Sequence, residues 1–130
     1  MTTEVVLDAS AILANILREP GAEVVREAAS QAVVSAVNLA EVVVKLIDLG
    51  MDEREAEFTT FRTPYRVASA DRSQAISVAR MYPRIRRLGV SLGDRFCLAL
   101  AQETGRPILT ADRKWKDLEG VLGVEVILIR

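Results

Sequence analysis

Short apolar runs alternate along the chain with longer segments in which apolar residues recur at helical spacing. Five of the short runs, most of them rich in β-branched residues, predict strands of a buried sheet. The expected strands cover Glu4–Leu7, Ala32–Ser35, Tyr65–Ala68, Pro107–Leu109 and Val124–Ile129.

Between the expected strands, apolar residues recur every three or four positions, which predicts amphipathic helices. Glycine and proline mark several of their ends, as at Gly50 and Pro64. Asn38 is expected to cap the third helix, and Pro83 is expected to interrupt the fifth. The expected helices cover Ala9–Arg18, Val24–Ala29, Asn38–Leu49, Asp52–Arg62, Asp71–Leu88 and Ser91–Gly105.

Strands that alternate with helices along a chain are typical of a parallel sheet with crossover helices. The predicted fold class is therefore α/β with three layers, in which helices flank a central parallel sheet. The chain has 130 residues and contains no repeat or linker. We therefore expect one domain that covers residues 1–130.

The composition excludes several kinds of chemistry. The chain has no histidine and one cysteine, Cys97, so it has no Ser-His-Asp triad, no Cys-His pair and no Cys/His zinc site. With no signal peptide or membrane span in view, the sequence is expected to belong to a soluble cytoplasmic protein. Its net charge of −1 gives no global indication of a polyanionic partner.

Four acidic residues, Asp8, Glu41, Asp94 and Asp112, lie just after expected strands or in the first turns of expected helices. In an open α/β sheet, binding sites lie beyond the carboxyl ends of the strands, so one edge can bring these acids together. Carboxylates from several segments are the hard oxygen ligands that Mg²⁺ or Mn²⁺ requires.

Each acid also has a purely structural explanation. Asp8 can cap the helix that follows it, and Asp112 can cap a short helix at residues 113–118. Glu41 with Asn38, and Asp94 with Ser91, have the spacing of capping boxes. Taken singly, a cap is as good an explanation as a ligand. Four acids at one expected edge favour a site.

Four segments of this sequence resemble those of the PIN-domain nucleases, and the nearest resemblance is to their VapC-type toxins. The segments are Val6–Ala11, Asn38–Val42, Ser91–Ala101 and Leu109–Arg113. The resemblance covers essentially the whole chain. It implies a Rossmann-like sheet, an acidic pocket of Asp8, Glu41, Asp94 and Asp112, cleavage of RNA with Mg²⁺ or Mn²⁺, and neutralisation by an antitoxin encoded beside the toxin.

Hydrolysis of a phosphodiester without histidine is consistent with metal-activated water. Asp8 and Asp94 are the expected direct metal ligands, Asp112 is expected to complete the ligand set, and Glu41 is expected to bind a second ion or a water. Attack by water predicts products with 5′-phosphate and 3′-hydroxyl ends. This chemistry does not by itself select RNA over DNA, and that selection comes from the resemblance.

Other residues near the acids have expected supporting roles. Ser10 and Thr110 each lie two residues from a site Asp and are expected to support the metal ligands, although both can equally be turn or cap residues. Arg95 and Arg113 flank the expected pocket, where they can contact RNA phosphates or antitoxin carboxylates.

The helices at residues 9–17 and 38–49 carry more apolar residues than one core-facing stripe needs. The surplus predicts a surface that is covered by an antitoxin segment, by a second copy in a homodimer, or by both.

Two other function classes fit parts of the pattern. A receiver-type phosphoacceptor has a similar length and an acidic Mg²⁺ pocket, but it needs adjacent acids after the first strand and a lysine after a late strand. Here Asp8 is followed by Ala9, and Asp112 stands near the place of the lysine. A non-catalytic module that binds a partner through its apolar helices is the other alternative.

Overall fold

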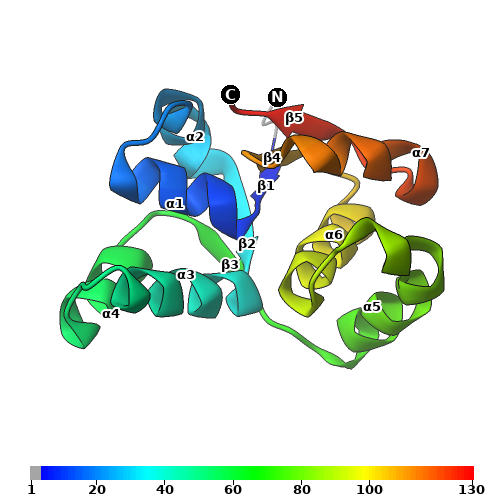
Figure 1. Ribbon diagram of the computed structural model, residues 1–130, viewed down its shortest axis with the longest axis horizontal. Helices are drawn as coiled ribbons and strands as arrows, with labels where there is room; N and C mark the ends of the chain where they lie inside the picture. Colours follow the sequence, from blue (N-terminus) through cyan, green and yellow to red (C-terminus); the bar gives the residue numbers. More distant parts are fainter. Residues whose placement is uncertain (1–3) are drawn as a thin grey trace.

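The computed structural model describes residues 4–130, and its centre is a five-stranded sheet in which every pair of neighbouring strands is parallel (Figure 1). Strand order across the sheet is β3-β2-β1-β4-β5. The predicted α/β fold with a central parallel sheet is therefore confirmed. The strands are β1 (Val5–Leu7), β2 (Ala32–Ser35), β3 (Arg66–Ala68), β4 (Ile108–Thr110) and β5 (Val126–Leu128).

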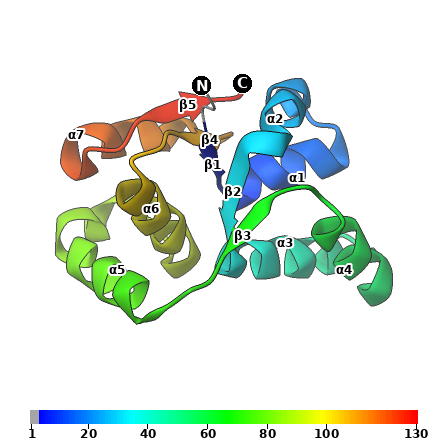
Figure 2. The ribbon, with the colours of Figure 1, turned by 180° about the vertical axis from the view of Figure 1, so that it is seen from behind.

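Helices cover both faces of this sheet, which gives the three predicted layers (Figures 1 and 2). One face carries α1 (Ala9–Leu17), α2 (Ala22–Ala28), α3 (Ala36–Asp48) and α4 (Glu53–Phe61). The other carries α5 (Arg72–Ile85), α6 (Leu92–Thr104), the 3₁₀ helix η3 (Arg113–Leu118) and α7 (Glu119–Leu122). Short 3₁₀ helices lie at Ala29–Gln31 and Arg86–Leu88. Among residues 4–130, no helix is long and apolar enough to cross a membrane.

Alternate residues of the strands supply the two halves of the core. In β1, Val6 packs with the α5–α6 side, whereas Leu7 packs with the α1–α3 side. Val33 and Val34 of β2 divide in the same way. Because the sheet is covered on both faces, β1, β2 and β4 are buried throughout, whereas the edge strand β3, which begins with Arg66, is largely exposed.

The strand order decides between two of the expected function classes. Receiver-type proteins have the doubly wound order 2-1-3-4-5, in which the first and third strands are neighbours. Here β1 lies between β2 and β4. The receiver alternative is therefore excluded. The same order reverses direction between β1 and β4, which is the place where open α/β sheets bind their ligands.

The predicted cap of α3 is wrong. Ser35, the last residue of β2, caps the helix, and its hydroxyl accepts a hydrogen bond from the Val37 backbone N at 3.2 Å. The chain therefore passes from strand to helix without a loop, and the helix begins two residues before Asn38. Asn38 lies inside the first turn of the helix and is buried there instead of capping it.

The predicted interruption at Pro83 is also wrong in its position. Helix α5 continues through Pro83 to Ile85 and only then changes to a 3₁₀ turn. Proline removes one hydrogen bond, that to the carbonyl four residues earlier, which belongs to Ala79. Both Ala79 and Pro83 are on the exposed side of the helix, where water can replace that bond.

Candidate active site

The four predicted acids lie at the carboxyl edge of the sheet. Asp8 directly follows β1, and Asp112 lies two residues beyond the end of β4. Asp94 is in the first turn of α6, whereas Glu41 is in the second turn of α3, because that helix begins earlier than predicted. The site thus draws residues from both helical layers and from the two strands at which the strand order reverses.

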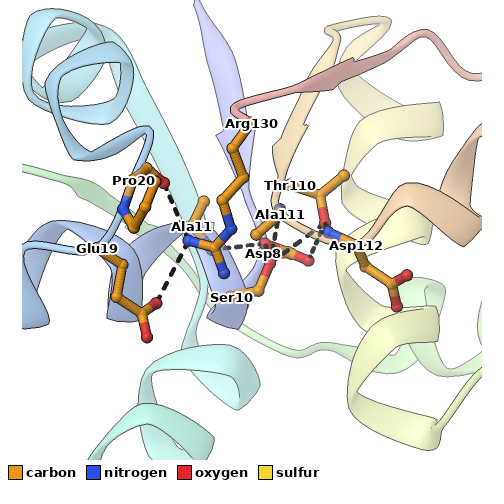
Figure 3. A network of polar contacts seen from close by, with 9 residues as sticks. All are labelled: Asp8, Ser10, Ala11, Glu19, Pro20, Thr110, Ala111, Asp112 and Arg130. Carbon is orange, nitrogen blue, oxygen red and sulfur yellow. Dashed lines mark hydrogen bonds and ion pairs between the residues drawn. The ribbon is translucent and has the colours of Figure 1, made fainter.

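Asp8 is almost completely buried and is held by three hydrogen bonds (Figure 3). One carboxylate oxygen, Oδ1, accepts from the Ser10 hydroxyl at 2.7 Å and from the Ala11 backbone N at 2.8 Å. The other oxygen, Oδ2, accepts from the Thr110 hydroxyl at 2.6 Å. Asp8 is therefore the cap of α1, and its carboxylate is fixed at the edge of the sheet where the site is expected. Its role as a metal ligand stays a prediction.

The hydroxyls of Ser10 and Thr110 join the ends of β1 and β4. Each hydroxyl donates its one hydrogen bond to Asp8. The two hydroxyl oxygens lie 3.2 Å apart, and neither has a hydrogen left to donate to the other. The Ser10 hydroxyl oxygen accepts a hydrogen bond from the Ala111 backbone N at 2.9 Å, and the Thr110 hydroxyl oxygen accepts one from the Asp112 backbone N at 3.0 Å. These bonds orient Asp8 and also fix the chain that leads to Asp112.

Burial raises the pKa of Asp8 from 3.8 to about 6, because the charged form loses its water. The bonds from Thr110, Ser10 and Ala11 act in the opposite direction, and the charge of Asp94 adds a smaller increase. A buried carboxylate whose charge is stabilised only in part is a favourable place for a cation.

Asp94 and Asp112 also combine capping with electrostatic coupling. Asp94 and Ser91 form the predicted capping box, with bonds of 3.1 and 3.2 Å. Burial raises the pKa of Asp94, the two Ser91 bonds lower it, and the negative charge of Asp112 raises it again. Asp112 caps η3 by accepting from the Lys114 backbone N at 3.0 Å, as predicted.

Glu41 is held by two residues whose roles the sequence did not reveal. The Asn38 side-chain nitrogen donates to Glu41 Oε1 at 2.8 Å. Gly93 lies so close to the Glu41 carboxyl group that any Cβ at this position would collide with it. Two features of the sequence could have indicated these roles. Asn38 and Glu41 are three residues apart, which puts them on one helix face, and a glycine directly precedes Asp94.

Cys97 lies within electrostatic range of three of the acids. Burial raises the pKa of its thiol well above the ordinary value, and the negative charges of Asp8, Asp94 and Glu41 raise it further. Asp112 acts in the same way on Asp94, and we refer to these four acids at the carboxyl edge of the sheet as the acidic cluster. Cys97 itself is fully buried in the core, as expected.

The donor set of this cluster fits a hard divalent cation. Within residues 4–130, however, no three Asp, Glu, His or Cys side chains lie close enough together to bind one metal ion directly. Mg²⁺ usually keeps several water ligands and is bound through one or two carboxylates. The spacing therefore suits an ion that contacts one or two of these acids and reaches the others through water.

The two arginines beside the site have different surroundings. Arg95 is half-buried against α5, where its guanidinium donates to the Val78 carbonyl at 3.3 Å and lies 5.0 Å from the centre of the Tyr82 ring. Arg113, the first residue of η3, is exposed next to Asp112. Of the two, Arg113 is the one whose charge is open to a partner.

Comparisons with known proteins agree on one fold. The model of the PIN-domain family matches residues 5–121. DNA-bound VapBC from Salmonella typhimurium has a TM-score of 0.77 at 18% sequence identity, over 98% of this chain and 99% of that one. VapBC2 from Rickettsia felis, bound to a promoter DNA fragment, has a TM-score of 0.75 at 11% identity, over 97% and 98%. VapBC-5 from Mycobacterium tuberculosis has a TM-score of 0.65 at 22% identity, over 97% and 98%. No curated protein matches the sequence.

Proposed function

Because the chain belongs to the PIN-domain family, we propose that it is a metal-dependent endoribonuclease, the VapC-type toxin of a toxin–antitoxin pair. PIN domains are nucleases, which sets the general class of reaction. The observation that carries the proposal is the position of Asp8 and Asp112 just beyond β1 and β4, where the strand order reverses. Glu41 of α3 and Asp94 of α6 lie on two helices that the Asn38–Gly93 hydrogen bond joins.

Asp8 and Asp94 are the residues that would hold the metal, with Asp112 completing the ligand set, in part through water. A bound Mg²⁺ or Mn²⁺ supplies an activated water and relieves the negative charge of the phosphate. Asp8 suits direct binding because its burial leaves a carboxylate with incomplete charge compensation. Its bonds to Ser10 and Thr110 keep the carboxylate in one orientation, so little reorganisation is needed on binding.

Glu41 would orient the attacking water. Asn38 fixes its Oε1, and the second oxygen, Oε2, has no hydrogen-bond donor among the described residues. A carboxylate oxygen that no protein donor occupies can accept a hydrogen from water. Reaction by water leaves a 5′-phosphate on one product and a 3′-hydroxyl on the other.

The RNA backbone would approach over the exposed basic residues beside Asp112. Arg113, Lys114 and Lys116 are all exposed on η3, directly next to the acidic cluster. Phosphate contacts of this kind orient a nucleic acid without reading its sequence. The preference for RNA over DNA rests on the family.

An antitoxin is the proposed protein partner. The neighbouring structures include VapBC complexes, and this chain exposes apolar side chains that a partner can cover. The predicted surplus at residues 38–49 includes Val44 of α3 and Leu49, which follows it, each 58% exposed. Among the described residues, however, the most exposed aromatic side chains are Phe58 and Phe61 of α4, which the sequence interpretation did not single out.

A homodimer is the second proposed assembly. A shallow groove of about 450 Å³ on α3 is lined by Val37, Ala40 and Val44 together with the charged residues Glu41, Lys45 and Asp48. A second copy seated there would leave the aromatic surface of α4 free for the antitoxin. Cytoplasmic location follows from the proposed target, cellular RNA, and belongs to the proposal.

Cleavage of RNA by the purified protein tests the function. We expect cleavage with Mg²⁺ or Mn²⁺, none with excess chelator, and loss of activity in Asp94→Asn with the fold retained. Glu125→Gln, at an exposed acid near the amino end of β5, is the matched control and should cleave normally. Full activity in folded Asp94→Asn would contradict the proposed site, whereas a wild type that cleaves no RNA would favour the non-catalytic binding module.

A further inference from the structure

Asn38 is a buried polar residue that no capping role explains. Its side chain is 1% exposed, and Ser35 already caps α3. The side-chain nitrogen donates to two acceptors, Glu41 Oε1 at 2.8 Å and the Gly93 backbone O at 3.0 Å. The first acceptor is on its own helix, and the second is on α6, in the opposite helical layer (Figure 1).

The other polar atom of Asn38 indicates that stability does not account for this residue. Its Oδ1 is buried and has no hydrogen-bond partner among the described residues. An unpaired buried acceptor costs free energy, and an apolar side chain of similar size would avoid that cost. An asparagine here is therefore better explained by what its nitrogen does than by what it adds to the core.

Gly93 completes the contact. The two helices α3 and α6 approach so closely that the Glu41 carboxyl group occupies the space where a Cβ of Gly93 would lie. The Glu41 carboxylate is consequently confined by the Asn38 nitrogen on one side and by the Gly93 backbone on the other. Asp94 is the next residue after Gly93, so the same contact sets the separation of Glu41 and Asp94.

We propose that Asn38 is a positioning residue, which orients the Glu41 carboxylate and holds α3 and α6 in register across the acidic site. The inference rests on the proposed nuclease function and deepens it. Asn38 itself touches neither substrate nor metal. It acts through Glu41, and that dependence can be measured.

A double-mutant cycle of Asn38→Leu and Glu41→Gln separates positioning from a general packing role. Residues that support a metal site in this way typically contribute about 10- to 100-fold in activity or metal affinity. We expect a loss of this size in kcat for Asn38→Leu, with KM for RNA nearly unchanged. In the Glu41→Gln background, Asn38→Leu should cause little further loss. Mn²⁺ affinity, measured by titration calorimetry without RNA, should fall in the single variant and show the same lack of additivity.

Asn15→Leu is the matched control. Asn15 is also a helical asparagine with one side-chain bond, from its Nδ2 to the Tyr65 hydroxyl at 3.1 Å, and it lies outside the acidic cluster. It should keep the activity and Mn²⁺ affinity of the wild type. If Asn38→Leu does not fold, Asn38→Ala removes the donor without adding a charge beside Glu41, and the same cycle applies.

The outcomes separate this inference from the function on which it rests. If the wild type is active and Asn38→Leu loses as much activity in the Glu41→Gln background as in the wild-type background, the positioning role alone is overturned. Unchanged activity and Mn²⁺ affinity in folded Asn38→Leu and Asn38→Ala would also overturn it. A wild type that neither cleaves RNA nor binds Mn²⁺ would overturn both the function and the inference.

Discussion

Asp8 combines a structural and a chemical role in one side chain. As a helix cap it is expected to stabilise the fold, but its burial also makes its negative charge costly at neutral pH. Capping raises the free energy of unfolding, whereas burial of the charge lowers it, and only the effect of the charge depends on pH near neutrality. They can therefore be separated by measuring stability.

Asp8→Asn should stabilise the metal-free protein at neutral pH. The side-chain oxygen of Asn can still accept from the Ala11 backbone N, so the cap is kept. Its NH₂ group can donate to the Thr110 hydroxyl oxygen, and the Thr110 hydroxyl can then donate to the Ser10 oxygen, 3.2 Å away. The pKa of Asp8 rises from 3.8 in the unfolded chain to about 6 in the folded protein. Protonated Asp8 therefore contributes fully to the free energy of unfolding below about pH 4, and this contribution is lost as the pH rises through 6. At roughly 1.4 kcal/mol for each pKa unit, the loss reaches about 3 kcal/mol.

Urea unfolding at two pH values checks this prediction. The advantage of Asp8→Asn over wild type should increase by roughly 1–2 kcal/mol between pH 5 and pH 7.5, both with chelator. An advantage that is the same at both pH values would show that burial of the Asp8 charge is not its cause.

Gly93→Ala should displace the Glu41 carboxyl group and change the stability little. Its Cβ would meet only the carboxyl atoms of Glu41, the far end of a flexible side chain, which must shift. A helical alanine gains up to about 1 kcal/mol over glycine, which offsets that shift. Gly120→Ala is the control, since nothing lies within 4 Å of a Cβ there. Thermal melts should give both variants melting temperatures close to that of the wild type, and RNA cleavage should fall only in Gly93→Ala. Equal cleavage by the two variants would contradict the close packing at Gly93.

For individual residues, the sequence predicted those roles that depend only on neighbours in the chain. Asp8, Ser91 and Asp112 are adjacent in sequence to the helix that each caps, so their roles could be predicted. The role of Asn38 depends on Gly93, which is 55 residues away. No local pattern contains that contact.

At the scale of elements, strands and helices were predicted to within a few residues because each carries a strong apolar pattern. The exceptions have local causes. Ser35 and Asn38 are both good capping residues, and only the packing of β2 against its neighbours selects the first. Pro83 ends a helix when its missing bond is buried, and here it is on the exposed side.

Helix α4 supports a prediction about the antitoxin. Phe58 and Phe61 are 66% and 54% exposed, so replacing both with Ser should change the melting temperature little. If the antitoxin covers them, loss of two aromatic contacts should weaken the complex by about tenfold or more. Titration calorimetry of the two partners measures this change.

Val121→Ser is the control for that experiment, because Val121 is 40% exposed on α7 in the other helical layer. It should leave the affinity unchanged. Equal affinity of the double Phe variant and the wild type would place the antitoxin elsewhere on the protein.

For the whole molecule, the proposed site couples metal binding to folding. The acidic cluster exists only in the folded chain, so a divalent ion should raise the melting temperature as its concentration rises. At about 100 times the dissociation constant, the gain is about 2.7 kcal/mol. Wild type and Glu125→Gln should shift equally with Mg²⁺ or Mn²⁺, whereas Asp94→Asn should shift much less. Identical shifts in all three would show that the ion binds outside this cluster.

The central claim is that four carboxylates form one site for hydrolysis of RNA by metal-activated water. Mapping the ends of the RNA products, after cleavage by wild type with Mg²⁺, tests it most directly. We predict 5′-phosphate and 3′-hydroxyl ends, and no products with excess chelator or in Asp94→Asn. Products with 2′,3′-cyclic phosphate ends, or cleavage that persists in chelator, would contradict it.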